Sequence, residues 1–320
     1  MSGSKTPHQI GVTTTARLHM GFFDLHGGLG RRFGSIGLAL SEPVTRLVVA
    51  RATEFAATGP GGERALAYAR QFMQSQGLEG ALAVEIESAI PEHSGLGSGT
   101  QMAMAAGWAL VRLYDLPLKP RDVAAVMQRG MRSGIGIGAF EQGGLLVDGG
   151  RAPDTVLPPL LARLDFPEDW RILLMFDNSG TGVHGKQEIE AFRALPEFSA
   201  ETAAKLCRRV LMQALPAVAE RDLAAFGAAI YEIQCCIGDY FASAQGGERF
   251  TSATVGGLLE WLHGQGIGCV GQSSWGPTGF AIVENESEAQ SLLTALKEKC
   301  ADLKHMNFMV CRARNQGMAS

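Results

Sequence analysis

Hydrophobic and polar residues follow two different periods in the first half of the chain. Residues Ala81 to Glu87 alternate as in a half-buried strand, whereas Met102 to Leu113 is rich in Ala, Met and Leu at helical spacing. The same criteria predict further strands over Ile10 to Thr14, Ile36 to Leu40, Val44 to Arg51 and Gly144 to Val147. They predict helices over Glu63 to Gln76, Thr100 to Leu113 and Arg121 to Met131.

The second half is predicted to contain more helix. Its strands are expected at Arg171 to Phe176, Cys269 to Val270, Gly279 to Val283 and Phe308 to Cys311. Its helices are expected at Lys186 to Leu195, Ala200 to Ala214, Ala219 to Ile233, Ser252 to His263 and Glu286 to Cys300. Because strands and helices seldom alternate strictly, the pattern favours an α+β fold over a Rossmann sheet.

The element pattern changes near Asp165, in a segment interrupted by Pro153, Pro158, Pro159 and Pro167. A chain of 320 residues suits one large or two modest domains. We therefore expect two packed lobes, with residues 1–165 in the first and residues 166–320 in the second.

A Gly-rich segment, PEHSGLGSGTQ from Pro91 to Gln101, connects a predicted strand to a predicted helix. The first N–H groups of a helix lack intrahelical partners and carry the positive end of the helix dipole, so an anion can dock there. The pattern is neither a Walker A loop nor GxGxxG. It predicts a phosphate cradle, with a plain Gly-rich turn capped by Ser or Thr as the alternative.

Glycine is concentrated elsewhere too. The 41 glycines of the chain are about twice the usual share, and they cluster rather than scatter. Three further clusters lie at Gly27 to Gly30, Gly134 to Gly144 and Gly271 to Gly279. The clustering therefore predicts several loops that approach one ligand.

Composition is that of an ordinary soluble enzyme, with 46% hydrophobic residues, 19% charged residues and a net charge of −4. It carries no basic bias towards nucleic acid, and no apolar run reaches the ~20 residues that span a membrane. The start of the chain lacks the apolar core of a signal peptide, so a cytoplasmic location is expected. The six cysteines show no zinc spacing and no disulfide framework.

Pro91 to Gln101 resembles the P-x-x-x-G-L-G-S motif of the GHMP superfamily, which includes galactokinase, homoserine kinase and mevalonate kinase. Gly271 to Gly279 resembles its C-terminal glycine motif. Within the superfamily, Ala16 to Leu25, the run RSGIGIGAFEQGGLLVDGGR from Arg132 to Arg151, and Val183-His184-Gly185 are similar to the β-ribofuranosylaminobenzene 5′-phosphate synthase family. The resemblance spans Thr15 to about Arg312.

This resemblance implies a two-lobed GHMP-type fold with the ligand between the lobes. Residues 1–165 would form the phosphate-binding domain and residues 166–320 the C-terminal α+β domain. It implies decarboxylating transfer of a phosphoribosyl group from phosphoribosyl pyrophosphate to 4-aminobenzoate or 4-hydroxybenzoate, early in tetrahydromethanopterin biosynthesis. CO2 and pyrophosphate are released. A homodimer is expected, and no nucleic-acid or membrane partner.

The departing pyrophosphate needs hydrogen-bond donors and Mg2+ where its negative charge develops. We assign the pyrophosphate to the Gly-rich loop, at Gly95, Gly97, Ser98, Gly99 and Thr100. Ser98 and Glu141 are the predicted Mg2+ ligands, with Asp24 a further carboxylate candidate. A capping or salt-bridged role is the structural alternative for both acids.

Anionic groups of the two substrates call for arginine, whose planar guanidinium matches a carboxylate or phosphate. Arg17, Arg32 and Arg132 are the candidates, and the sequence does not apportion them. His19 and His184 are predicted to orient substrate or to handle a proton, with a structural imidazole as the alternative. Lys186 and Trp275 are weaker candidates, because solvated lysines and core tryptophans are common.

Two other functions stay open at this stage. A GHMP-type ATP-dependent kinase would use the same loop for nucleotide phosphates, but many such kinases carry an S-G-x-D segment where this chain has Ser133-Gly134-Ile135-Gly136. A non-catalytic protein that binds a phosphate ligand is the third possibility, since a fold does not determine a function. The choice between an amino and a hydroxyl acceptor is also left open.

Overall fold

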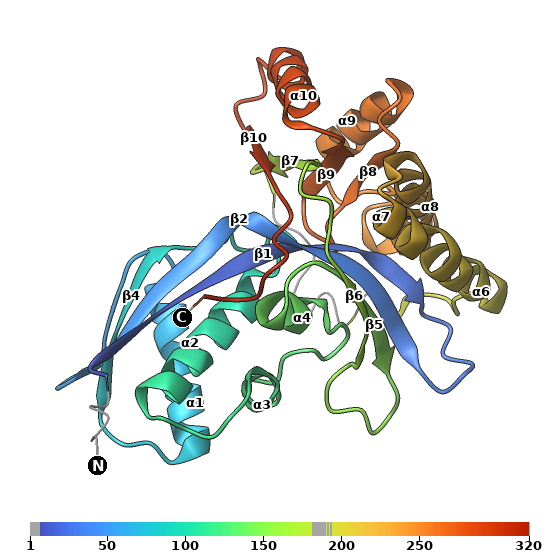
Figure 1. The fold of residues 1–320 in the computed structure, drawn as a ribbon. Coiled ribbons are helices and arrows are strands. Elements are labelled where there is room, and N and C mark those ends of the chain that lie inside the picture. Colours follow the sequence, from blue (N-terminus) through green and yellow to red (C-terminus); the bar gives the residue numbers. More distant parts are fainter. Residues whose placement is uncertain (1–6, 181–189, 191, 193, 320) are drawn as a thin grey trace.

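The protein is described by a computed structural model that covers residues 7–180, 190, 192 and 194–319. In this part of the chain the strands form two sheets (Figure 1). The larger, six-stranded sheet has the order β3-β4-β2-β5-β6, with β1 paired to β2. Its strands are β1 (Gln9–Asp24), β2 (Arg32–Ala52), β3 (Ala56–Thr58), β4 (Ala81–Ser88), β5 (Leu145–Arg151) and β6 (Leu160–Leu164).

The smaller sheet has the order β10-β7-β9-β8, and each neighbouring pair of its strands is antiparallel. Its four strands within the described residues are β7 (Arg171–Asp177), β8 (Cys269–Gln272), β9 (Thr278–Val283) and β10 (Met306–Cys311). Strands and helices are segregated rather than strictly alternating, which confirms the α+β prediction. The two sheets fall on either side of residue 165, and the predicted domain boundary stays a prediction.

The helices are distributed between the two sheets. Figure 1 shows α1 (Gly62–Gln76), α2 (Ser98–Leu113), α3 (Pro120–Val126) and α4 (Ile135–Glu141) below the larger sheet in this view. The smaller sheet lies above, with α9 (Ala253–Gly264) and α10 (Glu286–Lys299) beside it. The remaining described helices are α6 (Ala200–Arg209), a π-helical turn (Val210–Ala214), α7 (Leu215–Glu220), α8 (Leu223–Phe241) and a 3₁₀ turn (Ala242–Ala244).

The predicted strand Ile10 to Thr14 is part of a much longer strand, because β1 continues to Asp24. Alternation is lost after Thr14 because both faces of the strand are covered. Ile233 of α8 contacts Gly21 from one side, and α2 and α4 also pack against β1. The two strands predicted at Ile36 to Leu40 and Val44 to Arg51 are likewise one strand, β2.

Two helices differ from the prediction. The helix expected over Arg121 to Met131 ends at Val126, since Gln128 and Gly130 adopt the left-handed region with φ of 52° and 79°. The helix expected at Ala219 begins instead at Leu223, where the Asp222 side chain accepts a hydrogen bond from Ala225 N at 2.8 Å. Helix α4 follows Gly134 and was not predicted, because its glycines obscure the helical pattern.

One hydrophobic core joins the two sheets. Leu18 and Leu38 of the larger sheet, Ile172 and Phe280 of the smaller one and Ile230 of α8 belong to a single buried cluster. The chain end strengthens this connection, because residues after β10 return to the larger sheet. There Arg314 N donates to Ala39 O at 2.9 Å. Among the described residues, no helix is long and apolar enough to cross a membrane.

Candidate active site between the two sheets

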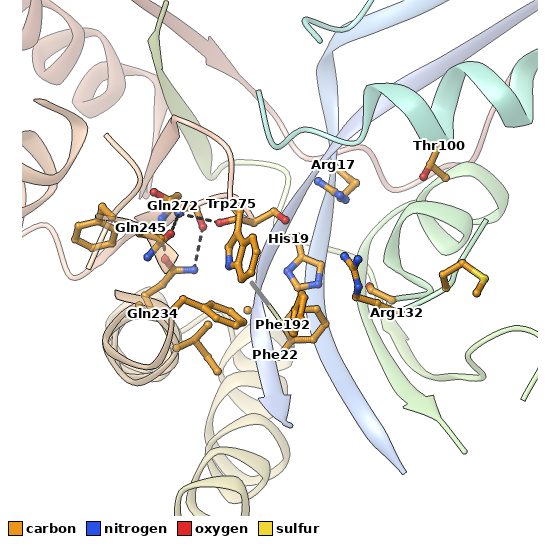
Figure 2. A pocket seen from close by; sticks show the side chains of 18 of the residues that line it. Arg17, His19, Phe22, Thr100, Arg132, Phe192, Gln234, Gln245, Gln272 and Trp275 are labelled. Atoms are coloured by element: carbon orange, nitrogen blue, oxygen red, sulfur yellow. Dashed lines mark hydrogen bonds between the residues drawn. The ribbon is translucent and has the colours of Figure 1, made fainter. Parts of the chain in front are cut away.

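A cavity of about 320 Å³ lies between the two halves of the chain. Its walls come from β1, the start of α2, the loop between α3 and α4, α8, residues 245–250 and the β8–β9 loop. Figure 2 shows side chains of both halves meeting around it. The cavity is thus formed only when segments more than 200 residues apart in sequence come together.

One part of the cavity wall is cationic. Among the described residues that line the cavity, every charged side chain is an arginine: Arg17, Arg129, Arg132 and Arg249. Arg132 lies 4.7 Å from the centroid of the Phe192 ring, and Arg129 lies 4.9 Å from that of Tyr68. Arg249 is paired with Asp239 at 2.7 Å, so its charge is already compensated. The potential of this wall favours an anionic ligand.

Another part of the wall is aromatic. Trp275 stacks on Phe192 with centroids 4.9 Å apart, and Phe241 packs edge-on against Trp275 at 4.6 Å. Phe22 packs against His19 at 4.6 Å and against Phe192 at 6.3 Å. Flat apolar side chains of this kind suit an aromatic ligand.

Three glutamines hold the wall behind these rings. Gln234 Nε2 donates to Met20 O at 2.6 Å, and its Oε1 accepts from Gln272 N at 2.7 Å. Gln272 Nε2 donates to Gln245 Oε1 at 3.1 Å and to Ser274 O at 2.8 Å, and its Oε1 accepts from Thr251 N. These amides make their hydrogen bonds within the protein, so their role is to keep the wall in position and not to bind a ligand.

The predicted phosphate loop connects β4 to α2, as expected. Gly97 is the residue before α2, with φ of 85°, and Thr100 in the first turn lines the cavity. Ser98 is 8% exposed and does not line the cavity, and Gly99 follows it in the first turn of α2. The positive end of the α2 dipole therefore lies beside Arg17 and the cavity (Figure 2).

Gly95 joins the two Gly-rich loops, and its predicted role in pyrophosphate binding stays a prediction. Its carbonyl oxygen accepts hydrogen bonds from Ser273 Oγ at 2.8 Å and from Arg17 Nη1. A Cβ atom added at Gly95 would lie 2.1 Å from Ser273 O, and one added at Gly276 would lie 2.2 Å from Gly95 N. The two Gly-rich loops thus pack backbone against backbone, and glycine is what permits the approach.

The loop that carries Arg132 is anchored by a buried carboxylate. Asp148 of β5 is fully buried, and its Oδ2 accepts from Ser35 Oγ at 2.6 Å, Ser133 Oγ at 3.0 Å and Gly134 N at 2.8 Å. Burial raises the pKa of Asp148, and these hydrogen bonds oppose that shift. The start of α4 is thereby tied to the larger sheet.

Asp24, Arg32 and Glu141 lie outside the cavity wall, as do Gly95, Gly97, Ser98 and Gly99 of the predicted phosphate loop. Asp24 accepts from His26 N at 2.9 Å in the turn after β1, and Arg32 donates to Leu25 O at 2.9 Å. The Glu141 carboxylate lies 3.5 Å from Arg121 Nη1; burial raises its pKa and Arg121 opposes the rise. His184 and Lys186 lie outside the described residues. Their predicted roles stay predictions.

The assignment of Ser98 and Glu141 as Mg2+ ligands stays a prediction. The described residues contain no group of three or more His, Cys, Asp or Glu side chains placed to hold a metal. Glu141 faces Arg121, and neither Glu141 nor Ser98 lines the cavity. The described residues of the wall that carry hydroxyl groups are Thr100, Ser133 and Ser274.

Sequence reasoning missed several residues of the wall. Arg129 falls inside the helix that was predicted too long, and Gln234 and Phe241 belong to α8, which carries no motif. Gln245 and Arg249 lie in the segment that follows α8. Gln272 lies in a glycine cluster that did mark the loop, and Trp275 of the same cluster was a weaker candidate.

Among the residues of the cavity wall, the predicted residue His19 has a strongly lowered pKa. It is 4% exposed, and burial together with the charge of Arg17 lowers its pKa from 6.5 to about 3. Its imidazole is therefore neutral at physiological pH.

Comparison with known proteins defines the class first. The model of the GHMP kinases N terminal domain matches residues 63–144, and that of the GHMP kinases C terminal domain matches residues 214–302. Homoserine kinase from Cytophaga hutchinsonii superposes with a TM-score of 0.70 over 100% of this chain and 99% of its own, at 14% identity. Galactokinase from Lactococcus lactis gives 0.70 over 98% and 96%, at 15% identity. The two-lobed GHMP-type fold is confirmed.

The relatives in sequence are more specific. A beta-ribofuranosylphenol 5'-phosphate synthase from Archaeoglobus fulgidus is 34% identical over 96% of this chain and 98% of its own length. The protein of the same name from Methanocaldococcus jannaschii is 33% identical over 85% and 88%. The chain therefore belongs to the beta-ribofuranosylphenol 5'-phosphate synthase family, a family of transferase-type enzymes, as its motifs predicted.

Proposed function

We propose that the protein transfers the phosphoribosyl group of phosphoribosyl pyrophosphate to the ring carbon of a para-substituted benzoate. The new bond joins the anomeric carbon of the ribose to the ring carbon that carries the carboxylate. Pyrophosphate leaves with the electron pair of the broken C–O bond. CO2 then leaves as the bond between the ring carbon and the carboxylate breaks, and the electron pair of that bond returns to the ring and restores its aromaticity. The cavity itself carries the proposal, because one wall is cationic and another aromatic.

The acceptor to examine first is 4-hydroxybenzoate. The names of the relatives contain a ribofuranosylphenol, and decarboxylation of a 4-hydroxybenzoate adduct yields a phenol. 4-Aminobenzoate would yield the corresponding aniline by the same steps, and it is the second acceptor of the proposal.

The described residues of the cavity can bind these substrates and stabilise the charge that develops in the reaction. Negative charge grows on the leaving pyrophosphate as its bond breaks, and fixed dipoles and guanidinium groups stabilise it most effectively where water is excluded. The N-terminal turn of α2 with Thr100, together with Arg17, Arg129 and Arg132, supplies that field. The aromatic wall binds the acceptor ring.

In the proposed reaction, Mg2+ binds together with the pyrophosphate group of the substrate. Mg2+ keeps several waters and is commonly held through substrate phosphates with only one or two protein oxygens. Thr100 and Ser133 could supply such oxygens, and bound Mg2+ would neutralise charge on the leaving group.

The test is a turnover assay with phosphoribosyl pyrophosphate, Mg2+ and carboxyl-labelled 4-hydroxybenzoate, followed through released CO2 and pyrophosphate, with 4-aminobenzoate and ATP hydrolysis in parallel. We expect equimolar release of CO2 and pyrophosphate. ATP turnover without either product would instead favour a kinase, and binding of phosphoribosyl pyrophosphate without turnover of any substrate would favour a non-catalytic protein.

Arg132→Ala gives a matched variant for this assay. Loss of a guanidinium that meets an anionic substrate is expected to lower kcat/KM at least about tenfold, given the strength of charge-assisted hydrogen bonds. Arg208→Ala, which removes an exposed arginine of α6, is the control and should keep wild-type kinetics. Equal kinetics of the two variants would remove Arg132 from the site.

A cytoplasmic location and a homodimer complete the proposal. The homodimer rests on the family resemblance, and the cytoplasmic location rests on the sequence pattern. Light scattering of the purified protein measures the second directly, and a molar mass near 34.0 kDa rather than twice that value would overturn it.

A further inference from the structure

Two neutral side chains at the cavity hold buried polar atoms that lack a hydrogen-bond partner among the described residues: His19 Nε2 and Trp275 Nε1. His19 is 4% exposed and Trp275 is 5% exposed. The neighbouring glutamine amides, in contrast, make their hydrogen bonds within the protein. A buried polar atom without a partner is unfavourable unless a ligand or water provides one.

The position of His19 is rigidly defined. Its backbone N donates to Ser273 Oγ at 3.1 Å, and its carbonyl accepts from Ser274 N at 3.0 Å. Its ring packs edge-on against Phe22. Figure 2 shows the imidazole between the aromatic side chains and the arginines. The second lobe thus holds the main chain of His19, and Phe22 of the same strand packs against its ring.

The unpartnered atom of the neutral imidazole is Nε2, whereas Nδ1 is not among the buried atoms without a partner in the described residues. We take the proton of the neutral ring to be on Nδ1, so that Nε2 offers an acceptor. In a neutral imidazole with the proton on Nδ1, Nε2 carries only a lone pair. A lone pair repels phosphate and carboxylate oxygens and attracts an O–H or N–H group.

We propose that His19 Nε2 accepts a hydrogen bond from the para hydroxyl or amino group of the aryl acceptor and that His19 thereby selects acceptors with a donor at this position. The inference rests on the proposed function, since it assigns one part of that site. The aromatic surroundings of His19 favour an aryl donor over a ribose hydroxyl. Trp275 Nε1 donates to an oxygen of the same ligand.

A binding cycle tests the assignment. Calorimetry gives the Kd of 4-hydroxybenzoate and of 4-methylbenzoate, which has no donor, for the wild-type protein and for His19→Phe. We expect the wild type to prefer the hydroxyl compound at least about tenfold, because a site built around a hydrogen bond rejects a ligand that cannot make it. In His19→Phe the ratio of the two Kd values should fall towards one.

Further variants keep the test decisive. His19→Gln places an amide oxygen near the position of Nε2 and should retain part of the preference for the hydroxyl compound. This variant also provides the test if His19→Phe does not fold. His263→Phe is the control, since His263 is exposed in α9, outside the cavity, and stacks on Tyr231. It should keep the wild-type ratio.

The outcomes separate the two proposals. An unchanged ratio in a folded His19→Phe overturns the inference, as does a rise confined to the KM of phosphoribosyl pyrophosphate, which would assign His19 to the ribose. Failure of the wild type to turn over either benzoate overturns the proposed function instead.

Discussion

At the residue scale, the polar side chains of the site are of two kinds. Some have hydrogen-bond partners within the protein, and others have a buried polar atom without a partner among the described residues. The Gln234 side chain is satisfied by backbone atoms of both lobes, and that of Gln272 by groups of the second lobe. His19 and Trp275 present buried polar atoms without partners among the described residues. The glutamines keep the cavity wall in position, whereas His19 and Trp275 can form hydrogen bonds with a ligand. Proximity in sequence does not separate them, because Gln272 and Trp275 lie three residues apart.

The lowered pKa of His19 predicts a pH dependence of stability. Between 6.5 and about 3 the unfolded chain holds a proton on His19 that the folded protein does not, so the His19 contribution falls as pH falls below 6.5. At pH 5 this amounts to about 2 kcal/mol relative to neutral pH. His19→Gln lacks the term, so its unfolding free energy, measured by urea denaturation, should fall less between pH 7 and 5. Parallel pH profiles for both proteins would contradict the shift.

At the element scale, two Gly-rich loops form the junction between the lobes. Ser273 and Gly276 of the β8–β9 loop contact Gly95 of the β4–α2 loop through backbone atoms. This contact places Trp275 against the same cavity as Thr100. Both loops carry the glycine motifs that marked the family, yet part of their glycine content supports packing between loops rather than phosphate binding.

Gly276→Ala is expected to disturb this junction. An added Cβ would lie 2.2 Å from Gly95 N and from Ser94 O, which are backbone atoms with little freedom to move. The expected loss is about 1–3 kcal/mol of unfolding free energy, as for other overpacked sites. Gly257→Ala in α9 is the control, because its Cβ meets open space and alanine favours a helix. If chemical denaturation finds the two variants equally stable, the junction is not rigid.

At the scale of the whole molecule, the cavity depends on a hydrophobic core shared by both sheets. Leu18, Ile172 and Ile230 belong to one buried cluster, and residues 312–319 return from the smaller sheet to the larger one. Without the other half, each half would expose the residues that it contributes to this shared cluster. A ligand held between the halves would therefore stabilise the whole chain through mass action.

A single unfolding transition is the expected consequence. Far-UV circular dichroism and tryptophan fluorescence should report the same midpoint, because Trp108 lies in α2 and Trp275 at the junction. Phosphoribosyl pyrophosphate should raise that midpoint for both probes together. Two separate midpoints would show that the halves unfold independently, as two domains with a weak interface do.

Much of the architecture followed from the sequence. Alternation located β4, helical spacing located α1 and α2, and the Gly-rich runs identified the loops that meet at the site. The motifs also identified the family. These properties are local, because the strand period, the helix period and the backbone freedom of glycine each depend only on a few neighbouring residues.

Other properties were decided only by tertiary structure. The second half of β1 is covered on both faces, so alternation could not reveal it, and His19 was placed on that strand only by the fold. Asp24 and Arg32 are close in sequence to Arg17 but lie outside the cavity wall, whereas Gln234 and Gln245 reach it from α8 and the segment beyond. The sequence by itself determined which loops could approach a phosphate. Which side chains share one cavity, and which buried atoms stay open for a ligand, depended on contacts between residues hundreds of positions apart.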